Sequence, residues 1–80
     1  MKTVGFTPAA RRAWRKLPAS AQTRITAALQ RYAASGQGDV TRLSGIEGAR
    51  LRVGNHRVIF TEAGDMIEVR AVGHRRDIYR

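Results

Sequence analysis

The stretch that decides the fold is residues 49–73, which read ARLRVGNHRVIFTEAGDMIEVRAVG. Apolar and polar side chains alternate along it with a period of two, which is the pattern of β-strands that bury one face. Gly54-Asn55 and Ala63-Gly64-Asp65 interrupt the alternation, and both segments favour tight turns between strands. The stretch therefore predicts an antiparallel meander of three strands. These strands are residues 49–53, 56–62 and 66–73.

The alternation also assigns the side chains of the meander to two faces. The apolar members, which predict the buried face, are Ala49, Leu51, Val53, Val58, Phe60, Ile67, Val69 and Ala71. His56 falls in step with Val58 and Phe60, so it is interpreted as an inward, structural histidine. The opposite face carries Arg50, Arg52 and Arg57.

The residues before the meander have a helical period instead. Thr7-Pro8 predicts a helix start, with the threonine as N-cap and the proline in the first turn. Apolar residues then recur every three or four positions in a helix that ends at Pro18 and in a second from Ser20 to Ser35, which Gly36 stops. Because few residues join the two helices, they are expected to form an antiparallel hairpin. Lys2–Phe6 is a candidate first strand.

The order of these elements predicts the fold class. A chain of 80 residues supports one domain with a modest core, so residues 1–80 are interpreted as a single domain. An N-terminal strand, a helical hairpin and a three-stranded antiparallel meander make an α+β fold with the helices on one face of the sheet.

The net charge is the strongest signal in the composition. Fifteen Lys and Arg residues face six Asp and Glu residues, which gives a formal charge of +9 and a pI near 11.7. Most of the basic residues are arginine, whose planar guanidinium group binds phosphate with two hydrogen bonds and stacks on bases. The charge therefore predicts a polyanionic partner, either nucleic acid, an acidic protein or both.

Other features of the composition exclude whole classes of site. The chain has no cysteine, so a disulfide framework, a thiolate nucleophile and a cysteine-based zinc site are excluded. Two histidines and six carboxylates show no metal-ligand spacing, and neither a metal nor a cofactor is expected. No apolar stretch has the length of a signal-peptide core or a membrane span, so a cytoplasmic location is expected.

A second basic group follows the last strand of the meander. It consists of His74, Arg75, Arg76 and Tyr79. In a meander the last strand lies beside the strand that carries Arg57, so this group and the arginine face can converge. Imidazole, phenol and guanidinium groups are the parts of metal-free RNA cleavage. One group takes the proton of the ribose 2′-hydroxyl, arginines stabilise the phosphorane, and another group protonates the leaving 5′-oxygen.

The same residues also have simpler interpretations. Arg50 and Arg52 can form the solvated face of a strand, Tyr79 can be a packing anchor, and Asp77 can pair with one of the neighbouring arginines. From the residues alone, an enzyme, a protein binder and a nucleic-acid-binding module all stay open. The chain lacks the spacing of a helix-turn-helix and an aromatic stacking platform on a strand, which argues against the last of these.

Several segments carry a resemblance to a known family. They are FTPAA at residues 6–10, KLP at 16–18, LSG at 43–45, RLRVGNHRVIF at 50–60 and VGHRRDIYR at 72–80. Together they resemble the RelE/ParE toxin superfamily over nearly the whole chain. The last segment is more similar to the RelE branch than to the gyrase-poisoning ParE branch.

The resemblance implies a bacterial or archaeal type II toxin that enters the ribosomal A site and cuts the mRNA codon there. A cognate acidic antitoxin, encoded beside it, is expected to wrap the toxin and block it. Arg57 matches the arginine that stabilises the transition state, and Arg75 matches a second phosphate-binding arginine. Tyr79 matches the tyrosine that stacks on the mRNA base or helps proton transfer. The alternative within the superfamily is a ParE-like DNA gyrase inhibitor without nuclease activity.

The resemblance leaves the general base open. Arg50 stands where relatives often have a lysine that takes part in proton transfer, and arginine is much harder to deprotonate. His74 is therefore the preferred base, because imidazole titrates near neutrality. Arg50, Arg52 and Arg76 are expected to contact RNA.

Overall fold

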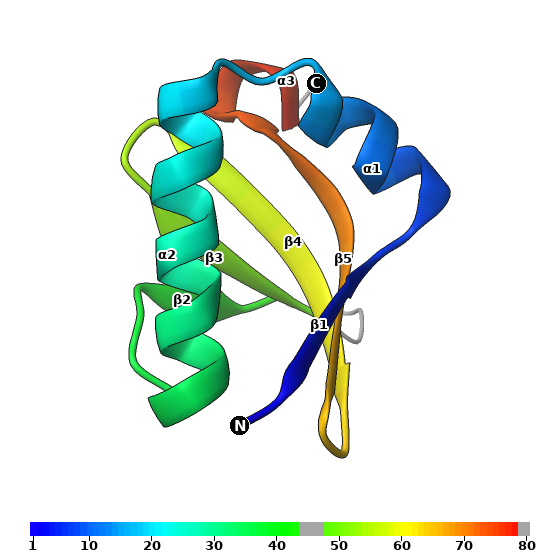
Figure 1. Ribbon diagram of the computed structural model, residues 1–80, viewed down its shortest axis with the longest axis vertical. Helices are drawn as coiled ribbons and strands as arrows, with labels where there is room; N and C mark the ends of the chain where they lie inside the picture. The colour runs from blue at the N-terminus through cyan, green and yellow to red at the C-terminus, as the bar shows by residue number, and fades with distance from the viewer. Residues whose placement is uncertain (44–47, 79–80) are drawn as a thin grey trace.

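The computed structural model describes residues 1–43 and 48–78 of the chain. Within them, one sheet of five strands is accompanied by three helices (Figure 1). The strands are β1 (Thr3–Phe6), β2 (Val40–Arg42), β3 (Ala49–Val53), β4 (His56–Ala63) and β5 (Met66–His74). The helices are α1 (Pro8–Arg15), α2 (Ala19–Ser35) and α3 (Arg75–Ile78).

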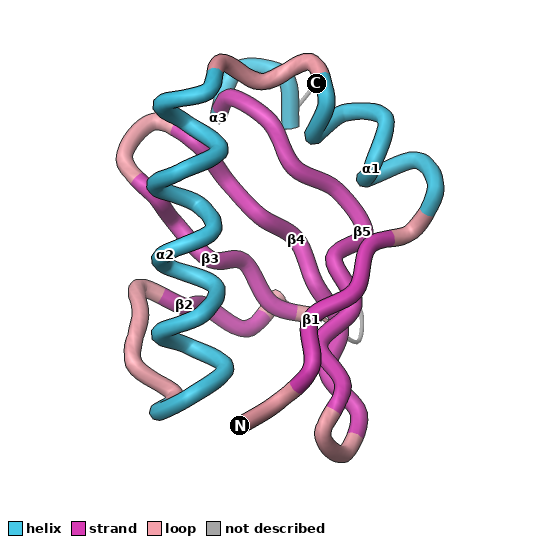
Figure 2. The backbone as a smooth tube through the Cα atoms, in the orientation of Figure 1, coloured by secondary structure: helices cyan, strands magenta, loops and turns pink. Residues whose placement is uncertain are grey.

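The sheet has the order β1-β5-β4-β3-β2, which places β4 in the middle. β2, β3, β4 and β5 pair antiparallel in sequence order, and β1 pairs parallel with β5. The predicted α+β class with an antiparallel meander is confirmed. The meander has a fourth strand that the sequence analysis missed, β2, because three residues are too few to show an alternation. The short helix α3 was also missed, and it follows β5 at the end of the sheet where the β3–β4 turn lies (Figure 2).

Local signals set the bounds of the two longer helices. The Thr7 hydroxyl accepts a hydrogen bond from the Ala10 amide at 3.2 Å and caps α1 as expected. Gly36 ends α2 with a φ of 77°, a left-handed conformation that is strained for residues with a Cβ. No helix in the part of the chain that the structure describes has the length and apolarity that a membrane span needs.

The two helices cover one side of the sheet and diverge from their short connection instead of lying flush together (Figure 1). α1 packs on β5, whereas α2 contacts β1 and β3. The two helices therefore do not pack against each other along their length as an antiparallel hairpin would, because each helix packs on a different part of the sheet. An apolar groove remains between them.

One apolar core fills the space between the sheet and the helices. Phe60 of β4 is fully buried at its centre, and its ring centroid lies 5.3 Å from that of Tyr32 in α2. The other buried members are Ala10, Ile25, Leu29, Ala33, Ala49, Leu51, Val58, Ile67, Val69 and Val72. Most of the apolar positions that the sequence predicts are therefore confirmed.

A polar cluster closes the rim of this core. The Tyr32 hydroxyl donates a hydrogen bond of 2.8 Å to Oε1 of Glu62, and the Lys2 ammonium group pairs with Oε2 of the same carboxylate. The Lys2 amide also donates to the Ala33 carbonyl at 3.0 Å. These contacts join the start of the chain, the central strand and the last turns of α2, and they offset the cost of half-burying a carboxylate.

The pairing of β4 with β5 contains a bulge between Ile59 and Phe60, where β5 has one extra residue, Arg70. Beyond the bulge the alternation is reversed. Val72 is 5% exposed and belongs to the core, while Ala71 pairs with Ile59 on the other side of the sheet. The predicted burial of Ala71 is therefore wrong, because a simple period of two cannot anticipate an inserted residue.

Substitution with aspartate tests this register. We predict that Val72→Asp unfolds the protein, because an unpaired buried carboxylate costs several kcal/mol, comparable with the whole stability of about 5–10 kcal/mol of a small domain. Ala71→Asp is expected to cost less than about 1.5 kcal/mol. Circular dichroism and urea unfolding of both variants provide the measurement, and the opposite ranking would support the register without a bulge.

Candidate functional site

Three arginines of the meander lie on the side of the sheet opposite α1 and α2. Arg52 of β3 is paired directly with Arg57 of β4, and Arg50 of β3 is paired with Ile59. Directly opposed residues of antiparallel strands project to the same face. The buried residues of β3 and β4 take the other face, so the shared arginine face that the alternation predicts is confirmed. Arg52 is exposed, whereas Arg50 and Arg57 are half-buried.

The guanidinium group of Arg57 is held by the turn that joins β3 to β4. Its Nη1 donates hydrogen bonds to the Gly54 and His56 carbonyl oxygens, both at 3.0 Å. Within the described residues, its Nε and Nη2 make no hydrogen bond. A guanidinium group carries five N–H bonds, so three of them remain available for an anion. Arg57 is thus positioned by the backbone and can still bind phosphate.

The same turn also holds the start of α3. The Arg75 amide donates a 2.8 Å hydrogen bond to the Asn55 carbonyl, which lies between the two carbonyls that Arg57 uses. In addition, Gly73 is paired with Arg57 in the sheet. Three successive carbonyl groups at this turn therefore bind the guanidinium group of Arg57 and the backbone amide of Arg75, two residues that are far apart in the sequence. The expectation that the last strand of the meander lies beside the strand of Arg57 is confirmed.

The C-terminal residues of the candidate site have different environments. Arg75 and Arg76 are exposed in α3. Tyr79, the expected stacking or proton-transfer residue, lies outside the described residues. Asp77 makes no ion pair with Arg75 or Arg76 within the residues that the structure describes, so that interpretation of Asp77 is wrong.

His74 lies with His56 on the other side of the sheet from the arginine face. The two histidines are paired in register, and their rings meet edge to face with centroids 5.7 Å apart. His74 Nδ1 accepts a hydrogen bond from the Arg76 amide at 3.2 Å. Beside the pair, the end of α1 and its connection to α2 border an open groove of about 490 Å³ that Lys16 also lines. The structure therefore does not place the His74 ring among the arginines of β3 and β4.

Arg24, a basic residue of α2 that was not among the expected site residues, also reaches this end of the sheet. The Nη1 atom of Arg24 in α2 comes within 3.9 Å of the place that a Cβ of Gly54 would occupy. No local pattern signals this approach, because it depends on how α2 crosses the sheet. Burial lowers the pKa of His56 below its ordinary value of 6.5, and the neighbouring His74 and Arg24 lower it further.

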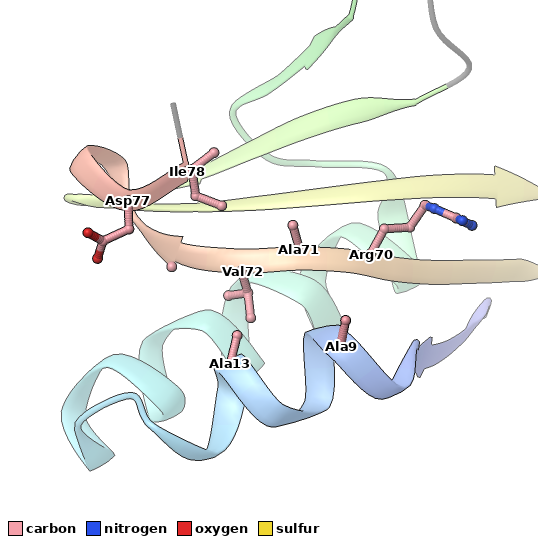
Figure 3. Close-up of a pocket in the computed structure, with 8 residues that line it drawn as sticks. Ala9, Ala13, Arg70, Ala71, Val72, Asp77 and Ile78 are labelled. Atoms are coloured by element: carbon pink, nitrogen blue, oxygen red, sulfur yellow. The ribbon is translucent and has the colours of Figure 1, made fainter. Parts of the chain in front are cut away.

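A second, smaller groove runs along β5 between α1 and α3 (Figure 3). Its volume is about 280 Å³, and small side chains such as Ala9 and Ala13 of α1 line it. A Cβ at Gly73 would lie 3.7 Å from Cγ1 of Ile78, an ordinary van der Waals distance, so the close packing of α3 on the strand does not itself require glycine here. Across residues 1–43 and 48–78, no three His, Asp or Glu side chains gather where they could hold a metal ion.

The lowered pKa of His56 predicts a pH dependence of stability. The folded protein disfavours protonated His56, whereas the unfolded chain protonates near the ordinary pKa, so the folded state binds fewer protons. The contribution of His56 is thus complete above the ordinary pKa and is lost as the pH falls toward the lowered one. We predict that His56→Gln weakens the loss of stability between about pH 7.5 and about pH 5.5. Urea unfolding of the two proteins measures it, and equal losses would contradict the assignment.

Comparisons with known proteins agree with this geometry. Residues 4–79 match the family model of the ParE toxin of type II toxin–antitoxin systems, parDE. The chain is similar to a chain of the RelB–RelE antitoxin–toxin complex from Methanococcus jannaschii, with 26% identity, a TM-score of 0.77 and coverage of 92% of this chain and 93% of that chain. A chain of the toxin–antitoxin complex RelBE2 from Mycobacterium tuberculosis is also 26% identical, with a TM-score of 0.63 and coverage of 92% and 98%.

A further solved structure shares the fold at lower identity. The isolated RelE toxin of E. coli is 18% identical, with a TM-score of 0.80 and coverage of 92% of this chain and 84% of that chain. The sequence matches none of the curated proteins with which it was compared.

Proposed function

The chain belongs to the ParE toxin family of type II toxin–antitoxin systems, within the RelE/ParE superfamily, and on that premise we propose that it is a metal-independent endoribonuclease that cuts mRNA on the ribosome. The observation that carries this proposal is the convergence of Arg57 and Arg75 on one turn, beside the arginine face of β3. Cleavage of this kind would inhibit translation in the cytoplasm, where ribosomes work.

The proposed chemistry uses a nucleophile that belongs to the RNA. The ribose 2′-hydroxyl loses its proton and attacks the adjacent phosphorus, and the bond to the 5′-oxygen breaks as that oxygen gains a proton. Negative charge grows on the phosphoryl oxygens in between. The free N–H groups of Arg57 can donate to those oxygens, and Arg75 supplies a second cation. Tyr79 is the proposed stacking or proton-transfer group.

The remaining basic residues are proposed to align the RNA. Arg50 and Arg52 lie on β3, beside the strand that carries Arg57, and Arg76 follows Arg75 in α3. Each of the three carries a guanidinium group that can pair with a backbone phosphate. The ion pair of Arg52 with Asp39 is weak, because the Arg52 Nε lies 4.0 Å from a carboxylate that is exposed to solvent. Because the arginine face offers no strong general base, the reaction should depend on the ribosome to align the substrate.

The decisive experiment is primer extension on a translated message, with and without ribosomes. We predict cleavage on ribosomes and little cleavage of free RNA. Arg57→Ala should reduce cleavage by about a hundredfold or more, since removal of one transition-state donor costs roughly 3 kcal/mol. Arg31→Ala is the matched control, because it removes the same charge from an exposed position of α2.

The family match also favours a second candidate, a ParE-like inhibitor of DNA gyrase. Such a protein acts by binding and has no chemical need for an arginine aimed at phosphate. If Arg57→Ala stays fully toxic with an unchanged circular dichroism spectrum, or if free RNA is cut as well as translated RNA, the ribosome-dependent ribonuclease is refuted. A gyrase supercoiling assay then tests the alternative.

The proposed regulator is an acidic antitoxin encoded by the neighbouring gene. Support comes from the charge of +9 and from the antitoxin–toxin complexes among the similar structures. The apolar groove between α1 and α2, of about 200 Å³, offers a place for its apolar side chains. Phe6 and Trp14 form one wall, with ring centroids 5.4 Å apart, and Thr26, Leu29 and Gln30 of α2 form the other.

A substitution in this groove tests the antitoxin surface. We predict that Thr26→Trp weakens binding of the neighbouring gene's product by at least about tenfold, because the indole fills the groove at a cost above 1.4 kcal/mol. Ala27→Trp is the control, since this residue is exposed and does not line the groove. Titration calorimetry measures both. Equal affinities of the two variants would show that the antitoxin binds elsewhere. If the wild-type protein does not bind an acidic product of the neighbouring gene, the proposed regulator is refuted.

A further inference from the structure

The helix α3 is too short to be stable by itself. It has four residues, Arg75–Ile78, whereas isolated helices need a dozen or more residues to form in water. Its position must therefore come from contacts with the rest of the protein. Those contacts matter to the proposed function, because this helix carries Arg75 and Arg76.

Two hydrogen bonds hold the first amides of α3. The Arg75 amide donates to the Asn55 carbonyl at 2.8 Å, and the Arg76 amide donates to Nδ1 of His74 at 3.2 Å. The first amides of a helix have no partner within the helix, so these two acceptors do the work of an N-cap. One of the two bonds depends entirely on the His74 imidazole.

This hydrogen bond also fixes the protonation of the ring. A nitrogen that accepts an amide N–H carries no hydrogen, so a neutral His74 carries its hydrogen on Nε2. Neither nitrogen is then free to take a proton from RNA. The edge-to-face contact with His56 holds the ring in this orientation, on the side of the sheet opposite the arginine face that includes Arg57.

We propose that His74 is a positioning residue that caps α3 and so places Arg75 and Arg76 beside the turn that holds Arg57. This role deepens the proposed ribonuclease function and rests on it. It replaces the role of general base that the sequence suggests for His74. The capping contact links the end of β5 to the position of both C-terminal arginines.

Two substitutions of His74 separate the two roles. In His74→Asn, the side-chain oxygen stands close to where Nδ1 stands and can accept the Arg76 amide, but it cannot act as a base near neutral pH. His74→Ala has neither property. We expect cleavage on ribosomes to fall by about tenfold in His74→Ala, the size of effect that loss of a helix cap has on a helix equilibrium, and His74→Asn to restore most of it.

Nuclear magnetic resonance tests the cap without any activity. The ¹⁵N shifts of His74 should show an unprotonated Nδ1 and a protonated Nε2. Exchange of the Arg76 amide hydrogen with solvent should be slow in the wild type and in His74→Asn and faster in His74→Ala. An Nδ1–H form of the ring, or an Arg76 amide that exchanges equally in all three proteins, would overturn the capping role.

The two measurements distinguish failure of this inference from failure of the proposed function. If the wild type cuts mRNA while His74→Asn is as inactive as His74→Ala, the positioning role is refuted and the ribonuclease stands. If both variants cut as well as the wild type, the positioning role is also refuted. If the wild type cuts nothing but the Arg76 amide shows the expected protection, the proposed function fails while the cap stands.

Discussion

The central strand β4 buries apolar side chains on one face and carries Arg57 on the other, and the rest of the structure depends on this division. Val58 and Phe60 are wholly buried in the core, where the Phe60 ring packs against Tyr32 of α2. The period of two then sends Arg57 and Ile59 to the opposite side. A slip by one residue would bury the guanidinium group and expose Phe60, at a cost of several kcal/mol. The position of the candidate site is thus a consequence of the packing of the core.

The turn at the start of β4 brings Arg57 and Arg75 together in the candidate site. Gly54 adopts a φ of 59°, which gives a tight connection between β3 and β4. The Arg57 guanidinium group and the Arg75 amide donate hydrogen bonds to three successive carbonyl groups, those of Gly54, Asn55 and His56. Two segments that are 18 residues apart in the sequence therefore meet on one short piece of backbone. Loss of this hairpin would separate the arginines even if the core stayed intact.

Much of this arrangement can be read from local sequence, because it depends on properties of single residues and on short-range periodicity. Thr7 caps the first helix, and Gly36 ends the second with a left-handed conformation. The alternation through residues 49–62 separates the buried positions from the arginine face and predicts the meander. The charge of +9, and the segments that resemble the RelE/ParE superfamily, predict the family that the comparisons identify.

Other features depend on contacts between distant segments, and only the tertiary structure decides them. The bulge at Arg70 arises where β5 pairs with β4, and it moves Val72 rather than Ala71 into the core. The approach of Arg24 to the turn depends on the path of α2 across the sheet. The imidazole of His74 suggested a general base, but its surroundings make Nδ1 the acceptor for the Arg76 amide. The sequence by itself determined which side chains are apolar, basic or turn-forming, because those are covalent properties. The tertiary structure decided which of them meet, because strand register and helix packing minimise the free energy of the whole chain.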